Sequence, residues 1–115
     1  MLLSLGVYLL TLHPGVGPFL DSIELQTAAL VRGVIHPPGS PQYLLLGRLA
    51  MSILPGADPA YRLNLMSALA GSMTVGVVYL LSYRLTRSLF ASGFAALSLA
   101  LGPLFWFESS ITELY

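Results

Sequence analysis

Long uncharged apolar stretches alternate with short polar ones along this chain, and their lengths predict membrane-spanning helices. Leu63 to Tyr83 carries no charge and is close to the roughly 20 residues that a helix needs to cross a bilayer. Leu89 to Phe107 is a second uncharged stretch of nearly that length. Met1 to Leu12 is apolar but too short to span, so we expect it to be the outer end of a first membrane helix.

A short helix is predicted before the first complete span. Asp21 has the residue type of a helix N-cap, and Glu24 three residues later completes a capping-box pattern for a helix from about Ser22 to Arg32. Gly33 is suited to close it. The Pro-Pro pair that follows cannot continue a helix.

A second short helix is predicted from the proline pattern that comes next. Ser40-Pro41 is a typical helix start, and Tyr43 to Leu54 is mostly apolar. At that length the segment suits an interfacial or re-entrant helix better than a span. Asp58-Pro59 then predicts the cap of the helix that enters the membrane.

The charges predict how these helices are oriented. Arg84 and Arg87 lie in a very short loop between the two spans, and short loops rich in Arg stay cytoplasmic. Residues 13–62 and Glu113 then lie on the outer side. The predicted fold is therefore an all-α integral membrane protein: the end of a first membrane helix, an outer loop with two short interfacial helices, then two transmembrane helices. We interpret residues 1–115 as one membrane domain.

Composition supports the membrane class and excludes several functions. Hydrophobic residues make up 56% of the chain and charged ones 9%, against about a quarter charged in soluble domains. The formal net charge is zero, so no basic surface exists to bind nucleic acid. There is no cysteine, and the two histidines are far apart in sequence, so we expect no metal site and no resident cofactor.

The acidic pair allows two interpretations. Asp21 and Glu24 are three residues apart and can face the same way on a helix, where one carboxylate would act as general base toward a hydroxyl and the other would position it. The capping box explains the same spacing without chemistry. Spacing alone favours the cap, although a capping carboxylate can also be catalytic.

The basic residues of the outer segment also allow two interpretations. Arg32, Arg48 and Arg62 run against the usual inward bias of Arg, and guanidinium groups bind phosphate through paired hydrogen bonds. Each could instead extend to water or pair with a carboxylate. We expect at least one of them to bind an anion. His36 could bind a phosphate or transfer a proton, or only stabilise the Pro-Pro turn.

Several motifs together resemble one family. They are Asp21-Ser22-x-Glu24, Gly33-x-x-His36-Pro37-Pro38-Gly39-x-Pro41-x-Tyr43, Leu46-Gly47-Arg48-Leu49, Tyr61-Arg62-Leu63-Asn64-Leu65, Phe105-Trp106 and Glu113-x-Tyr115. The chain is similar over nearly its whole length to the beginning of a bacterial family of multi-span membrane proteins of unknown function. That family is related to an animal transmembrane protein O-mannosyltransferase and belongs to the glycosyltransferase C superfamily. Ile23, Ser40 and Gln42 depart from its usual residues.

The resemblance implies a transferase that passes a sugar from a polyprenyl-phosphate donor to an acceptor hydroxyl at the outer face of the cell membrane. By motif, Asp21 would be the base, Glu24 and Glu113 would line the acceptor site, and His36 with Arg48 or Arg62 would contact the donor phosphate. The chain would then be the N-terminal part of a larger domain and inactive as a fragment. The alternative is a non-catalytic multi-span protein, either a carrier or an assembly subunit.

Overall fold

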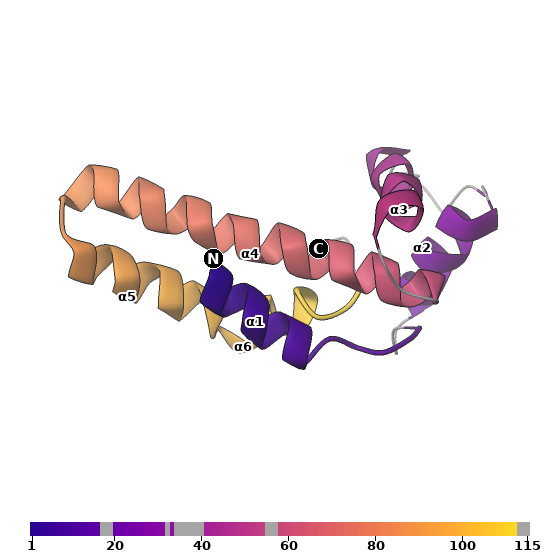
Figure 1. Ribbon diagram of the computed structural model, residues 1–115, viewed down its shortest axis with the longest axis horizontal. Helices are drawn as coiled ribbons and strands as arrows, with labels where there is room; N and C mark the ends of the chain where they lie inside the picture. The colour runs from indigo at the N-terminus through magenta and orange to yellow at the C-terminus, as the bar shows by residue number, and fades with distance from the viewer. Residues whose placement is uncertain (17–19, 32, 34–40, 55–57, 113–115) are drawn as a thin grey trace.

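A computed structural model of the chain describes residues 1–16, 20–31, 33, 41–54 and 58–112 (Figure 1). Over these residues the fold is all-α, as the sequence predicts. The helices are α1 (Leu2–Leu10), α2 (Leu20–Val31), α3 (Pro41–Ile53), α4 (Pro59–Thr86), α5 (Leu89–Ala100) and α6 (Pro103–Glu108). His36 and Glu113, two of the predicted site residues, lie outside the described residues.

Helix α4 is the axis of the molecule. Asp58 caps its first turn by accepting a hydrogen bond from the backbone N–H of Ala60 at 2.9 Å, as the Asp58-Pro59 pattern predicts. Its 28 residues are about 42 Å long at 1.5 Å per residue, and among the described helices it is the one long and apolar enough to cross a membrane. The predicted span from Leu63 to Tyr83 lies within it.

The other helices pack at different places along α4 (Figure 1). Helix α5 runs back along α4 after the turn at Arg87 and Ser88. Helices α2 and α3 lie at the opposite end, near Pro59, and α1 packs against the middle of α4. The turn with Arg84 and Arg87 and the segment with the acidic pair are thus separated by most of the 47 Å length of the molecule.

The second predicted span is not one continuous helix. Helix α5 ends at Ala100, and α6 begins again at Pro103 after a break at Gly102. Pro103 has no N–H to donate, and a proline ring clashes with the carbonyl four residues earlier, so the helix cannot pass through this point unbroken. Length and apolarity did not reveal the interruption, because Gly102 and Pro103 carry no charge.

The short helices also differ slightly from the prediction. Helix α2 begins at Leu20, so Asp21 lies inside its first turn and not at the predicted N-cap position. A carboxylate there still complements the positive end of the helix dipole. Near the other end the N–H of Gly33 donates to the carbonyl of Ala28 at 3.0 Å, which closes the helix as expected. Helix α3 matches its prediction within a few residues.

Two apolar clusters hold the helices together. The first joins α2, α3 and α4 and consists of Leu25, Ala28, Ala29, Leu44 and Leu63. Gly47 permits the close crossing of α3 over α4, because a Cβ atom there would lie 3.0 Å from Cδ2 of Leu63. The second cluster joins α4 to α5 through Val75, Ala96 and Ala100.

Candidate functional site

The acidic pair lies at the edge of the buried face of α2. Asp21 and Glu24 are both partly exposed, and each lies one turn before a buried member of the first apolar cluster, Leu25 and Ala28 respectively. Residues one turn apart share a helix face, so both carboxylates border the surface that α2 packs against α3 and α4.

Two of the predicted cations share one cleft. Arg48 of α3 and Arg62 of α4 both line a cleft of about 440 Å³ between α2, α3 and α4. Its other lining residues are Ala29, Leu30, Met51, Ser52 and Pro59. A cleft with two guanidinium groups and a hydroxyl can hold an oxyanion, because guanidinium groups donate paired hydrogen bonds to phosphate or carboxylate oxygens.

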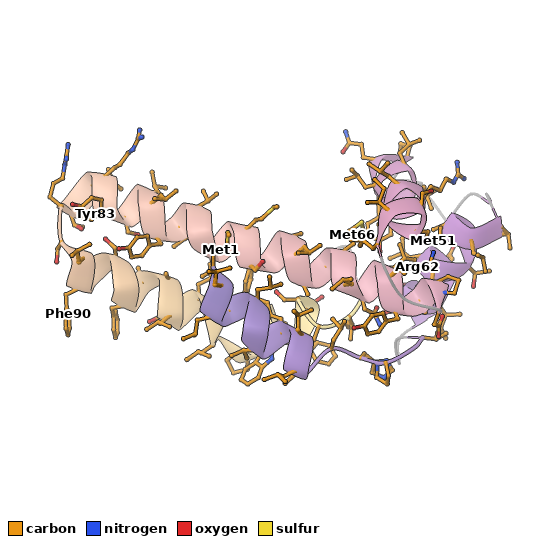
Figure 2. The ribbon with its side chains drawn as sticks, viewed as in Figure 1. Met1, Met51, Arg62, Met66, Tyr83 and Phe90 are labelled. Atoms are coloured by element: carbon orange, nitrogen blue, oxygen red, sulfur yellow. The ribbon has the colours of Figure 1, made fainter. Side chains whose placement is uncertain are left out.

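The two arginines are held differently. Arg62 donates from Nη1 to the carbonyl oxygen of Met51 at 2.5 Å, in the last turn of α3, where carbonyl groups lack helical partners (Figure 2). Nε of Arg48 is buried, and among the described residues it has no hydrogen-bond partner. Arg62 therefore has a structural role that accounts for part of its donor capacity, whereas Arg48 keeps a buried N–H donor available beside the cleft.

Helix α2 links the carboxylates to the cleft. Ala29 lines the cleft, and along the helix it lies about 8 Å from Glu24 and about 12 Å from Asp21 at 1.5 Å per residue. Side chains as long as arginine shorten this separation.

A buried polar cluster lies beside the acidic pair. Asn64 of α4, which is 0% exposed, accepts at Oδ1 from Nε2 of Gln26 at 3.1 Å and from the hydroxyl of Thr112 at 2.7 Å. Its Nδ2 donates to the carbonyl oxygens of His13 at 2.9 Å and Gly15 at 2.8 Å. Nε2 of Gln26 also donates to Thr112 at 3.0 Å. A helix-to-helix bond by Asn64 is expected from its polar side chain in a span, but Gln26 and Thr112 carry no sequence signal.

A second, more apolar cavity of about 460 Å³ lies between α3, α4 and α6. Glu108 lines it together with Tyr43, Ser109 and apolar residues of α4, and Oε2 of Glu108 is buried. From the sequence, Glu108 could join the site or be the solvated end of a helix; it is the last residue of α6 and is partly exposed, with one carboxylate oxygen buried. Within the described part of the chain, no three His, Asp or Glu side chains gather as a metal site would require.

Taken together, the fold and site define a helical protein in which one long apolar helix carries a carboxylate-bearing helix and an arginine-lined cleft at one end. Residues 21–115 match the family model described as "Protein O-mannosyl-transferase TMEM260 N-terminal domain". The chain belongs to this family, as its motifs predict.

Two curated relatives agree with this assignment. The chain is 37% identical over 110 residues to the mouse (Mus musculus) protein named "Protein O-mannosyl-transferase TMEM260", covering 96% of this chain and 16% of the mouse protein. It is 30% identical over 102 residues to the Dictyostelium discoideum protein of the same name, covering 87% of this chain and 12% of that protein. The chain thus spans less than a fifth of the length of these relatives. No solved structure matches it.

Proposed function

We propose that this chain forms the N-terminal, donor-binding part of a membrane-embedded glycosyltransferase that transfers mannose to a hydroxyl group of a protein. The relatives named above are O-mannosyl-transferases, which supports the sugar and the type of acceptor. The observation that carries the proposal is the placement of Arg48 and Arg62 in one cleft that α2, the helix with Asp21 and Glu24, helps to line.

Membrane embedding follows from the apolar surface. Helix α4 is longer than the roughly 30 Å apolar core of a bilayer, and only 17% of its most apolar 18-residue window is buried inside the molecule. Several large apolar side chains on α4 and α5 are exposed, namely Met73, Val77, Leu80, Leu81, Leu85, Leu89, Phe90, Phe94 and Leu97. In water such a surface would be unfavourable, whereas lipid tails would cover it.

The charge distribution supports a site on the non-cytoplasmic face of the cell membrane. Arg84 lies in the last turn of α4 and Arg87 in the short turn that follows it, and by the positive-inside rule we assign that end of α4 to the cytoplasm. The cleft lies at the opposite end. The positive-inside rule concerns charged residues in loops, and the two arginines of the cleft lie in helices. Arg62 binds the end of α3, and Arg48 is partly buried.

The chemistry needs a base near the acceptor and cations at the leaving group. Asp21 takes the proton of the acceptor hydroxyl, whose oxygen attacks the anomeric carbon of a polyprenyl-phosphate mannose. The bond between that carbon and the phosphate oxygen breaks, and the phosphate leaves with the electron pair. Arg48 and Arg62 stabilise the negative charge on the departing phosphate. Glu24 orients the acceptor, and we assign His36 to the donor phosphate and Glu113 to the acceptor site.

The test is transfer of mannose from a polyprenyl-phosphate donor to a hydroxyl-bearing peptide by the full-length protein in lipid. Asp21→Asn is expected to lower kcat by roughly 10²–10⁴-fold, as for loss of a general base. Arg48→Met is expected to weaken donor binding by about ten- to a hundredfold, because it removes charged hydrogen bonds. Asp58→Asn is the matched control, since it removes a carboxylate on the same side and keeps a good helix cap.

The same experiment separates a transferase from a carrier of lipid-linked sugars. A carrier would bind the polyprenyl-phosphate donor but transfer no mannose, even as the wild-type protein. If Arg48→Met weakens donor binding but Asp21→Asn still transfers mannose, the phosphate site is retained. Asp21 is then rejected as the base.

A further inference from the structure

We propose that Asn64 is a positioning residue that fixes the place and the rotation of α2, and so fixes the direction in which Asp21 and Glu24 point. This inference deepens the proposed function and rests on it for its catalytic part. The evidence is that Asn64 hydrogen bonds to three segments of the chain, namely His13 and Gly15, Gln26 of α2, and Thr112.

The amide of Asn64 is fully used. Its two N–H donors bind two carbonyl oxygens, and its carbonyl oxygen accepts two hydrogen bonds. The opposite amide orientation would direct Nδ2 at the donor Nε2 of Gln26 and Oδ1 at two carbonyl oxygens, so the network admits one orientation. A side chain with four satisfied bonds and no exposure has little freedom to move.

The anchors lie on both sides of the acidic pair along the chain. Gly15 is six residues before Asp21, and Gln26 is five residues after it. The backbone ahead of α2 is further tied because the N–H of His13 donates to the carbonyl of Ser110 at 3.1 Å. Asn64 therefore fixes the chain before α2 as well as the middle of α2, and Asp21 lies between the two points.

The bond to Gln26 also sets the rotation of α2. Gln26 and Ser22 are buried and one turn apart, so they mark the face of α2 that is turned into the protein near α4. At 100° per residue, Asp21 and Glu24 lie roughly 140° and 160° around the helix from Gln26, on the side of α2 away from it. A rotation of α2 by one residue would carry Gln26 away from Asn64 and would change the direction of both carboxylates.

One polar atom of the cluster is left unsatisfied. Among the described residues, the buried Oε1 of Gln26 has no hydrogen-bond partner, and an unsatisfied buried acceptor carries a desolvation cost. Leucine at this position would avoid that cost. We attribute the presence of Gln26 here to the geometry that its hydrogen bonds specify, and not to a gain in stability.

Kinetics of the full-length protein test the proposal with a polyprenyl-phosphate mannose donor. Asn64→Leu is expected to lower kcat by roughly a hundredfold, as for a reacting group displaced by about 1 Å, and to change the KM for the donor by less than about threefold. Gln26→Leu is expected to lower kcat by about three- to tenfold with the same KM, since it removes one anchor of the two. The control is Ser72→Ala, because Ser72 is buried on the same helix but binds only the carbonyl of Leu69.

A distance measurement tests the anchor without catalysis. Ile23 on α2 and Val77 on α4 are 43% and 62% exposed, and the given sequence contains no cysteine, so spin labels can be attached to cysteines introduced at these two positions. The wild type and Ser72→Ala are expected to give one narrow distance distribution. Asn64→Leu and Gln26→Leu should broaden or shift it.

The outcomes separate the two proposals. Unchanged kcat and an unchanged distance distribution in Asn64→Leu would overturn the positioning role, and where that variant does not fold, Gln26→Leu decides by the same two readouts. A wild-type protein that transfers no sugar would defeat the proposed function, while the distance distributions would still accept or reject the anchoring of α2.

Discussion

Replacing Gly71 by alanine is expected to disrupt the packing of α4 against the segment that follows α6. A Cβ atom at this position would lie 2.2 Å from Oγ and 2.8 Å from Cβ of Ser109, and 3.5 Å from Cε2 of Tyr8. Rotation of the Ser109 hydroxyl would relieve the first contact but not the second, because Cβ is fixed by the backbone. The backbone of residues 109–112 would have to move.

The size of the effect follows from a comparison with Gly93 on α5. A Cβ atom at Gly93 would meet nothing within 4 Å. Both glycines lie in helix interiors, so both alanine variants gain about the same helix propensity, up to about 1 kcal/mol. Their difference in the free energy of unfolding therefore isolates the overpacking, about 1–3 kcal/mol against Gly71→Ala.

The measurement is unfolding of the protein in mixed detergent micelles with increasing SDS, followed by far-ultraviolet circular dichroism. Gly71→Ala should unfold at a lower SDS fraction than the wild type, and Gly93→Ala at the same or a higher one. Equal stability of the two alanine variants would refute the close contact between α4 and Ser109. It would also weaken the case for the rigid placement of Thr112, three residues further on.

Two further predictions use the same unfolding assay. Asp58→Ala removes the side chain that caps α4 and should lower the free energy of unfolding by about 1 kcal/mol, whereas Asp58→Asn should change it little; equal losses in both variants would reject the cap. Leu63→Ala empties a fully buried position between α2, α3 and α4 and should cost about 2–5 kcal/mol, while truncation of the exposed Leu85 should cost far less; similar costs at the two sites would contradict the first apolar cluster.

The sequence predicts the helices where local chemistry determines their ends. Helix α4 begins after Asp58 and α3 begins at Pro41, as expected, and Gly33 closes α2 through the carbonyl of Ala28. These signals involve neighbouring residues only. The break at Gly102 was missed because hydropathy records apolarity and length but not the hydrogen bond that a proline cannot make.

The site could be predicted in part for a related reason. Charged residues in an apolar chain stand out, so Asp21, Glu24, Arg48 and Arg62 are found by type, and the fold then places the two arginines in one cleft. Gln26 and Thr112 are uncharged and 86 residues apart, and only the packed structure shows that they meet at Asn64. Pairings of this kind depend on tertiary geometry, for which a single sequence holds no local signal.

The hydrogen bonds of the described side chains divide the molecule into two parts of different character. In the half of α4 and α5 nearest Arg87, the hydroxyls of Thr74, Thr86 and Ser92 bind carbonyl groups one turn back on their own helix or at its cap. Such bonds satisfy polar groups without fixing one helix against another.

At the other end the bonds cross between segments. Asn64 joins α4 to α2 and to residues that follow α1 and α6, Arg62 joins α4 to α3, and Nε1 of Trp106 donates to Thr11 at 2.8 Å. An apolar helix pair can slide or tilt in lipid at little cost, whereas crossing hydrogen bonds specify one geometry. Rigid geometry is needed where reacting groups must be held, and in this chain it surrounds the carboxylates of α2 and the arginine cleft.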